Sequence, residues 1–219
     1  MTTSSTTSLT EISRPVRPSA GLFILSITAF TVLLADSAGA HTGDSQQRLD
    51  GVESLLHGII HPVSGVDHLL AMVAVGVLAA TSKNRQVAWL TPVGFVAGMA
   101  IGGVLGISVW SSVGVPAAEL AIAFSVILLG IFIATLTKTA GWWLPITAAV
   151  FGAFHGLAHG VELPSGAIPV SYIAGFLIAT AVLHMIGAGI GVGLRTSPRA
   201  RQAASVVVSS AGVVLLLSL

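Results

Sequence analysis

Histidine and carboxylate residues gather at two places in a chain that is otherwise strongly apolar. The two groups are His57, His61, Asp67 and His68, and then His155, His159 and Glu162. An ionisable group in bilayer hydrocarbon costs about 2.5–3.5 kcal/mol on insertion scales, so such groups are rare unless they have a function. Imidazole and carboxylate ligands suit Ni²⁺, Co²⁺, Zn²⁺, Fe²⁺ or Mn²⁺, and the chain has no cysteine for a thiolate site. The pattern predicts a transition-metal site within the membrane.

The composition indicates an all-α integral membrane protein. Of the 219 residues 54% are hydrophobic and 8% are charged, and the mean hydropathy is +0.95. A soluble domain carries about 25% charged residues, so this chain cannot cover a water-facing surface and needs the lipid bilayer as its solvent. Its net charge of +1 comes from dispersed residues and gives no reason to expect nucleic-acid binding.

Residues 1–40 have the features of a cleavable signal peptide. A long Ser/Thr-rich segment contains Arg14 and Arg17, an apolar run follows at 22–34, and 38–40 (Ala-Gly-Ala) offers the small residues of a cleavage site. The competing interpretation is an uncleaved first transmembrane helix. Cleavage would leave one mature domain, 41–219, with His41 at its N-terminus.

The mature domain is predicted to be a bundle of six transmembrane helices, each near the 20 residues that a bilayer requires. The expected spans are 62–81, 87–110, 116–136, 142–161, 168–194 and 203–219. Residues 49–60 are expected to form a short helix on the outer surface, because Pro62 suits the first turn of the helix that follows.

Basic residues alternate between the loops and so predict the orientation. They follow spans one, three and five, as Lys83, Arg85, Lys138, Arg195, Arg199 and Arg201, whereas the loops after spans two and four contain none. Because basic loops stay on the cytoplasmic side, both mature termini are expected outside the cytoplasm.

This topology places the two polar groups at matching depths. At about 1.5 Å per residue, Asp67, His68 and His155 lie roughly 10 Å below the outer surface. The same argument puts His61, His159 and Glu162 at the outer mouth. Asp67 points away from the stripe shared by His61 and His68, but its carboxylate could orient an imidazole by accepting the second ring N–H.

Four further residues are secondary candidates for metal passage, and each also has an ordinary structural explanation. His57 lies on the expected surface helix, where a histidine needs no function. Glu119 lies near the outer start of span three, and His184 lies in the middle of span five. His41 would combine its imidazole with the new amino terminus.

Glycine spacing predicts close helix packing in two spans. Residues 94, 98 and 102 repeat at intervals of four, and residues 187, 189, 191 and 193 repeat at intervals of two. The glycine-rich fifth span could serve a contact within one chain or an interface in a homo-oligomer.

Two segments resemble signatures of the HupE/UreJ family of bacterial permeases. Residues 61–72 (HPVSGVDHLLAM) are similar to the family's first-helix motif, and residues 154–162 (FHGLAHGVE) are similar to its fourth-helix motif. The resemblance implies a bacterial permease that supplies nickel, or cobalt in its place, for hydrogenase or urease maturation. With the predicted orientation, such a permease lies in the bacterial inner membrane and has its mature termini in the periplasm. The resemblance also implies that His61, Asp67, His68, His155, His159 and Glu162 carry the metal.

The transporter interpretation predicts no enzymatic activity and no prosthetic group, with Ni²⁺ as the cargo. The ligand types alone do not separate nickel from cobalt or zinc. The main alternative is an intramembrane zinc- or iron-dependent metalloenzyme, because three ligands and a water suffice for a hydrolytic zinc site. A rhomboid-like serine protease would need a Gly-x-Ser-x-Gly-like motif in a later span, and the chain has none. An assembly factor that holds metal without transporting it is the remaining alternative.

Overall fold

The computed structural model describes residues 48–109, 115–135 and 141–219, and every regular element in these ranges is an α-helix. The helices are α2 (Gly51–Ser64), α3 (Val66–Thr81), α4 (Arg85–Val109), α5 (Val115–Thr135), α6 (Trp143–Val161), α7 (Pro169–Leu194) and α8 (Pro198–Ser218). The predicted signal peptide, His41 and Lys138 lie outside the described residues.

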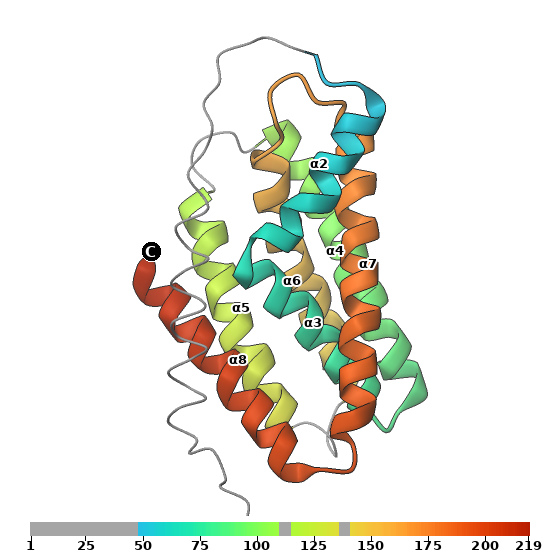
Figure 1. Ribbon diagram of the computed structural model, residues 1–219, viewed down its shortest axis with the longest axis vertical. Coiled ribbons are helices and arrows are strands. Elements are labelled where there is room, and N and C mark those ends of the chain that lie inside the picture. The colour runs from blue at the N-terminus through green and yellow to red at the C-terminus, as the bar shows by residue number, and fades with distance from the viewer. Residues whose placement is uncertain (1–47, 110–114, 136–140) are drawn as a thin grey trace, which may run out of the picture.

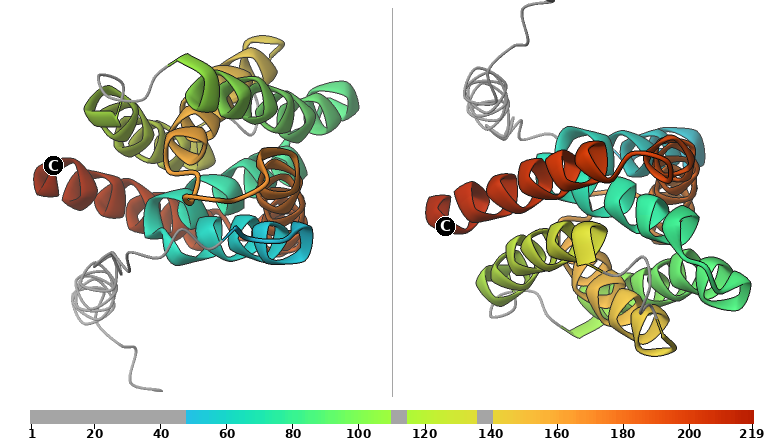
Figure 2. Two further views of the ribbon diagram at one scale, coloured as in Figure 1. Left: turned by 90° about the horizontal axis from the view of Figure 1, so that it is seen from above. Right: turned by 90° about the horizontal axis from the view of Figure 1, so that it is seen from below.

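The helices are arranged in two layers (Figure 2). Helices α4, α5 and α6 form one layer, and α2, α3, α7 and α8 form the other. Five helices, α4 to α8, are each long and apolar enough to cross a membrane, and the pair α2–α3 makes a sixth if it counts as one bent span. The chain is therefore a multi-pass α-helical membrane protein, in keeping with the predicted all-α bundle.

The first span is broken, and the sequence prediction placed the break at the wrong residue. Helix α2 continues through Pro62 to Ser64, and α3 leaves it at an angle of 83° after Gly65. Pro62 therefore lies in the last turn of α2 and does not begin the next helix. Asp50 starts α2 by accepting hydrogen bonds from the backbone N–H groups of Val52 and Glu53 at 2.7 and 2.8 Å.

Helix α2 packs against α7, as does α3 further along (Figure 1). A Cβ at Gly58 would overlap the backbone of Tyr172 in α7, and a Cβ at Gly76 would overlap that of His184. The predicted surface helix is thus packed against the bundle, and its residues Ser54, Gly58 and Pro62 are buried.

Glycine also sets the distance between α4 and α6, which lie side by side along their length. A Cβ at Gly98 would overlap the backbone of Ala149, and a Cβ at Gly156 would overlap that of Met99. The predicted packing role of the glycines in 94–102 is confirmed. In α7 the prediction holds at Gly187 and Gly191, which contact α3, whereas Gly189 and Gly193 have no other atoms within 4 Å of an added Cβ.

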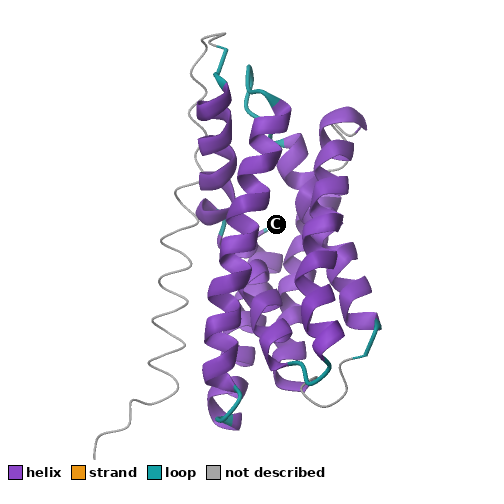
Figure 3. Cartoon of the chain, turned by 90° about the vertical axis from the view of Figure 1, so that its right-hand side faces the viewer, coloured by secondary structure: helices purple, strands orange, loops and turns teal. Residues whose placement is uncertain are grey.

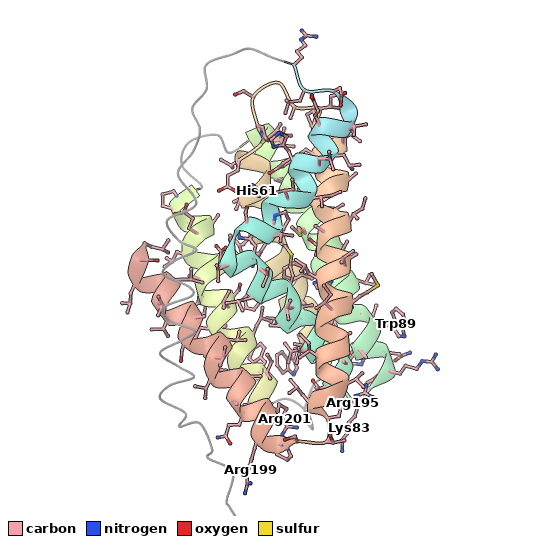
Figure 4. All side chains as sticks on the ribbon, viewed as in Figure 1. His61, Lys83, Trp89, Arg195, Arg199 and Arg201 are labelled. Atoms are coloured by element: carbon pink, nitrogen blue, oxygen red, sulfur yellow. The ribbon has the colours of Figure 1, made fainter. Side chains whose placement is uncertain are left out.

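Several basic residues gather at one end of the bundle (Figure 4). Lys83, Arg195, Arg199 and Arg201 lie at one end, and His61 lies in the opposite half. Arg195 donates from its guanidinium to the carbonyl oxygen of Ala80, with an Nε–O distance of 2.7 Å. This bond ties the end of α7 to the end of α3, and the side view in Figure 3 shows the helices running between the two ends.

The glycine contacts predict a sharp difference between two identical substitutions. Gly98→Ala should lower the melting temperature of the detergent-solubilised protein, because its new methyl group meets backbone that cannot move aside; overpacking of this kind costs about 1–3 kcal/mol. Gly189→Ala has open space around it and should leave the melting temperature unchanged or slightly raised. An equal fall in melting temperature in both variants would show that the close contact between α4 and α6 does not determine the stability of the protein.

Candidate metal site

The six predicted metal residues meet between the two layers. Helix α2 supplies His61 from its last turn, and α3 supplies Asp67 and His68 from its first turn. Helix α6 supplies His155 and His159, and Glu162 is its C-terminal cap residue. The site is therefore assembled from the break in the first span and from one end of α6.

His61, His159 and Glu162 form a group that we call the outer triad. The Nε2 atom of His61 lies 2.7 Å from Oε2 of Glu162, and one ligand atom from each residue lies within 4.8 Å of the others. Ligand atoms on one transition-metal ion lie about 3–4 Å apart, so small side-chain rotations would bring the triad onto an ion. The side chains of His61 and Glu162 are 33% and 41% exposed, so the triad is reachable from outside the bundle.

His68 and His155, the inner pair, continue the site into the bundle. The ring centroid of His68 lies 4.4 Å from that of His159 and 5.1 Å from that of His155. The ring centroid of His159 also lies 4.8 Å from that of His61. The four imidazoles therefore form a continuous series in the order His61, His159, His68 and His155. His155 and His159 are fully buried.

Two of the imidazoles are oriented by hydrogen bonds at Nδ1. Asp67 Oδ1 lies 2.7 Å from Nδ1 of His68, and the Phe151 carbonyl oxygen lies 2.8 Å from Nδ1 of His155. Both partners are acceptors, so each ring carries a proton on Nδ1, and in its neutral form it presents the lone pair of Nε2. A carboxylate or carbonyl behind an imidazole is the usual support for a metal-binding histidine.

The nitrogens that these bonds leave free have no protein partner. Among the described residues, the buried atoms without a hydrogen bond include Nε2 of His68, Nε2 of His155 and both ring nitrogens of His159. A buried polar group without a partner costs about 1–3 kcal/mol, so four such nitrogens in one place need an explanation. A bound cation would supply the missing partner for several of them at once.

The sequence prediction missed the aromatic residues that surround the site. Phe176 of α7 stacks on His159 with ring centroids 5.1 Å apart, and Tyr172 lies 6.2 Å from His61. The hydroxyl of Tyr172 is buried and has no partner among the described residues. The sequence did contain one signal that could have pointed to Tyr172, because it is the only tyrosine of the chain and lies in an apolar span.

Three of the secondary candidates lie within the described residues. His57 and Glu119 are exposed, and neither forms a hydrogen bond with another described side chain. His184 is buried in α7, where the ring of Phe95 lies between it and His155, with centroid distances of 5.3 and 5.2 Å. His184 is therefore a neighbour of the inner pair without direct contact.

The fold and the site define a multi-pass helical membrane protein with a buried polyhistidine site. The family model described as HupE / UreJ protein matches residues 29–215. Protein HupE of Rhizobium leguminosarum bv. viciae is 41% identical over 166 residues, which cover 76% of this chain and 82% of that protein. No solved structure matches the chain. The chain belongs to the HupE/UreJ family.

The Asp67–His68 contact predicts a single tautomer for His68. In the wild-type protein, ¹⁵N spectra of histidine side chains should show His68 protonated at Nδ1, because the carboxylate can only accept at neutral pH. Asp67→Asn replaces that acceptor with an amide that can also donate, so the His68 signals should shift toward a mixture of tautomers. The matched control Asp50→Asn, at the start of α2, should leave them unchanged. Unaltered His68 signals in Asp67→Asn would contradict the assignment.

Proposed function

We propose that this chain is a permease that carries Ni²⁺, or Co²⁺ in its place, from the periplasm to the cytoplasm. Its family consists of nickel/cobalt transporter-type accessory proteins. The observation that carries the proposal is the convergence of unpartnered imidazole nitrogens of His68, His155 and His159 between the layers. The functional link to hydrogenase or urease maturation belongs to the same proposal.

The outer triad would take up the ion. Its exposed carboxylate, Glu162, attracts a hydrated cation, and His61 and His159 then replace part of the water shell. His159 belongs to the triad and is also the neighbour of His68, so it can keep hold of the ion while the inner pair displaces His61 and Glu162. Exchange of one ligand at a time avoids a fully dehydrated ion, which would be very costly in a low-dielectric interior.

Two carboxylates match the charge of the cargo. Glu162 lies at the mouth, and Asp67 lies behind His68, so each stage of the site has one negative charge close to the imidazoles. A divalent cation with two carboxylates and neutral imidazoles forms a group of no net charge. The cost of bringing such a group into hydrocarbon is far lower than that of a bare dication.

Beyond the inner pair, the packing is apolar. Phe95 lies against His155, and Met72 follows His68 one turn along α3; both are fully buried. The ligands are therefore approached from the end that holds Glu162. The conformation fits a stage in which the site receives an ion and the route to the basic end is closed.

The charged ends support an orientation in the bacterial inner membrane. Lys83, Arg195, Arg199 and Arg201 share one end of the bundle (Figure 4), and basic segments stay in the cytoplasm. Glu162 and the mouth of the site then face the periplasm, as does the C-terminus. This orientation gives the proposed direction of transport.

Radiolabelled nickel uptake into bacteria without nickel importers tests the function. The wild-type chain should raise uptake, and His68→Ala or His155→Ala should lower it at least tenfold, because each removes a ligand that nothing else replaces. Cobalt and zinc are added as competitors to rank the metals.

The control for this measurement is Gln202→Ala, an exposed position of α8, compared at equal membrane abundance. It should transport as the wild type does. If the wild-type chain gives no uptake above background for any of these metals, the permease proposal fails. The intramembrane metalloenzyme is then the function to examine.

Fusions at two positions test the orientation. Alkaline phosphatase folds only outside the cytoplasm and should be active when fused after Leu219, whereas green fluorescent protein at that position should stay dark. Fusions after Asn84, beside Lys83, should give the opposite pair of results. A fluorescent fusion at Leu219 would reverse the proposed direction of transport.

A further inference from the structure

A groove runs between α3, α4 and α7, in the half of the bundle that holds the basic end. Its volume is about 660 Å³, and its walls are mostly small or apolar residues, among them Ala80, Trp89, Val93, Ala97 and Met185. Trp89 and Met185 are each more than 60% exposed, at 67% and 66%. In a membrane these walls face lipid.

The groove is long enough to hold an acyl chain of one lipid leaflet. Along α7 and its cap residue, its lining extends from Arg195 to Ala181, and fourteen residues of helix rise about 21 Å. Half of a bilayer's hydrocarbon thickness is about 15 Å. An acyl chain that enters at Arg195 therefore reaches the level of His184.

The mouth of the groove is positively charged and has no acidic neighbour in the sequence. Arg195 is part of the lining, and Lys83 and Arg85 are exposed in the connection from α3 to α4 beside it. The chain has no Asp or Glu in residues 68–118 or 163–219. These cations therefore lack the counter-charge that an acidic residue of the adjoining segments would supply.

Arg195 is held in place at this mouth. The bond from its guanidinium to the Ala80 carbonyl fixes the side chain between the ends of α3 and α7. A fixed cation above an apolar groove costs little further ordering when it binds an anion. A phosphate group fits this position because its oxygens accept from the remaining guanidinium N–H groups.

We propose that this groove binds an anionic phospholipid of the leaflet at the basic end. One acyl chain fills the groove up to His184, and the phosphodiester and anionic headgroup lie among Arg195, Lys83 and Arg85. Basic pockets between transmembrane helices bind anionic headgroups on this principle. A zwitterionic lipid fills the groove equally well but leaves the cations without a net counter-charge.

Trp89 is a local reporter of the occupant. The full chain with Trp110, Trp142 and Trp143 replaced by phenylalanine is reconstituted into phosphatidylcholine vesicles that contain a varied fraction of brominated lipid. Brominated phosphatidylglycerol should quench Trp89 at a several-fold lower mole fraction than brominated phosphatidylcholine. Equal quenching by the two lipids would show ordinary boundary lipid and overturn the proposal.

Charge and shape variants separate the two parts of the site. Lys83→Gln should raise the phosphatidylglycerol fraction needed for half-quenching by about fivefold, as expected for one basic residue near a headgroup. Arg199→Gln removes the same charge from the same end but lies on α8, outside the lining, and should change little. Ala181→Phe fills the groove and should abolish the preference without a change of charge.

Three outcomes would refute the assignment. An equal effect of Lys83→Gln and Arg199→Gln would indicate a diffuse surface charge. An unchanged preference in Ala181→Phe would place the lipid elsewhere. A Trp89 that neither lipid quenches would mean that a second copy of the chain covers this face.

Discussion

The contact between Asp67 and His68 is the interaction on which the site depends. One oxygen of this carboxylate accepts from the backbone N–H of His68 at 2.8 Å and lies 2.7 Å from the Nδ1 atom of the same residue. It therefore accepts from a backbone N–H in the first turn of α3, orients the imidazole and supplies a negative charge. Gly65 makes room for this arrangement, because a Cβ there would lie 2.8 Å from Asp67 Oδ1 and 3.2 Å from His68 Nδ1. The break between α2 and α3 and the candidate metal site share one cause.

Glycine packing then brings the second half of the site to this break. The glycines of α4 and α6 let these two backbones touch, which fixes His155 and His159 on a rigid pair of helices. Gly58 and Gly76 do the same for α2 and α3 against α7. The imidazoles thus sit on elements whose backbones are in direct contact.

The sequence predicted the helical class, the approximate spans and all six residues that meet between the layers. Composition and spacing suffice for this, because ionisable groups in hydrocarbon are few and helical periodicity is simple. The break at Gly65 could not be predicted, since Pro62 is compatible with either the first or the last turn of a helix. Phe176 of α7 could not be predicted either, and for Tyr172 the one signal was its being the only tyrosine of the chain. Which face of a wholly apolar helix points inward depends on its neighbours, and α7 has no amphipathic pattern that would reveal it.

The order of ligands along the site suits a carrier better than a storage site. Glu162 is exposed, so under the proposed function it would bind a hydrated cation quickly and release it easily in water. The carboxylate of Asp67 lies behind its imidazole, where it strengthens His68 as a ligand without occupying a coordination position itself. His155 has only a carbonyl behind it, which is a weaker support. On the proposed route, an ion that moved inward would exchange a charged ligand for neutral ones and would become easier to release. Such a gradient fits transport, because a closed set of strong ligands would hold the ion permanently.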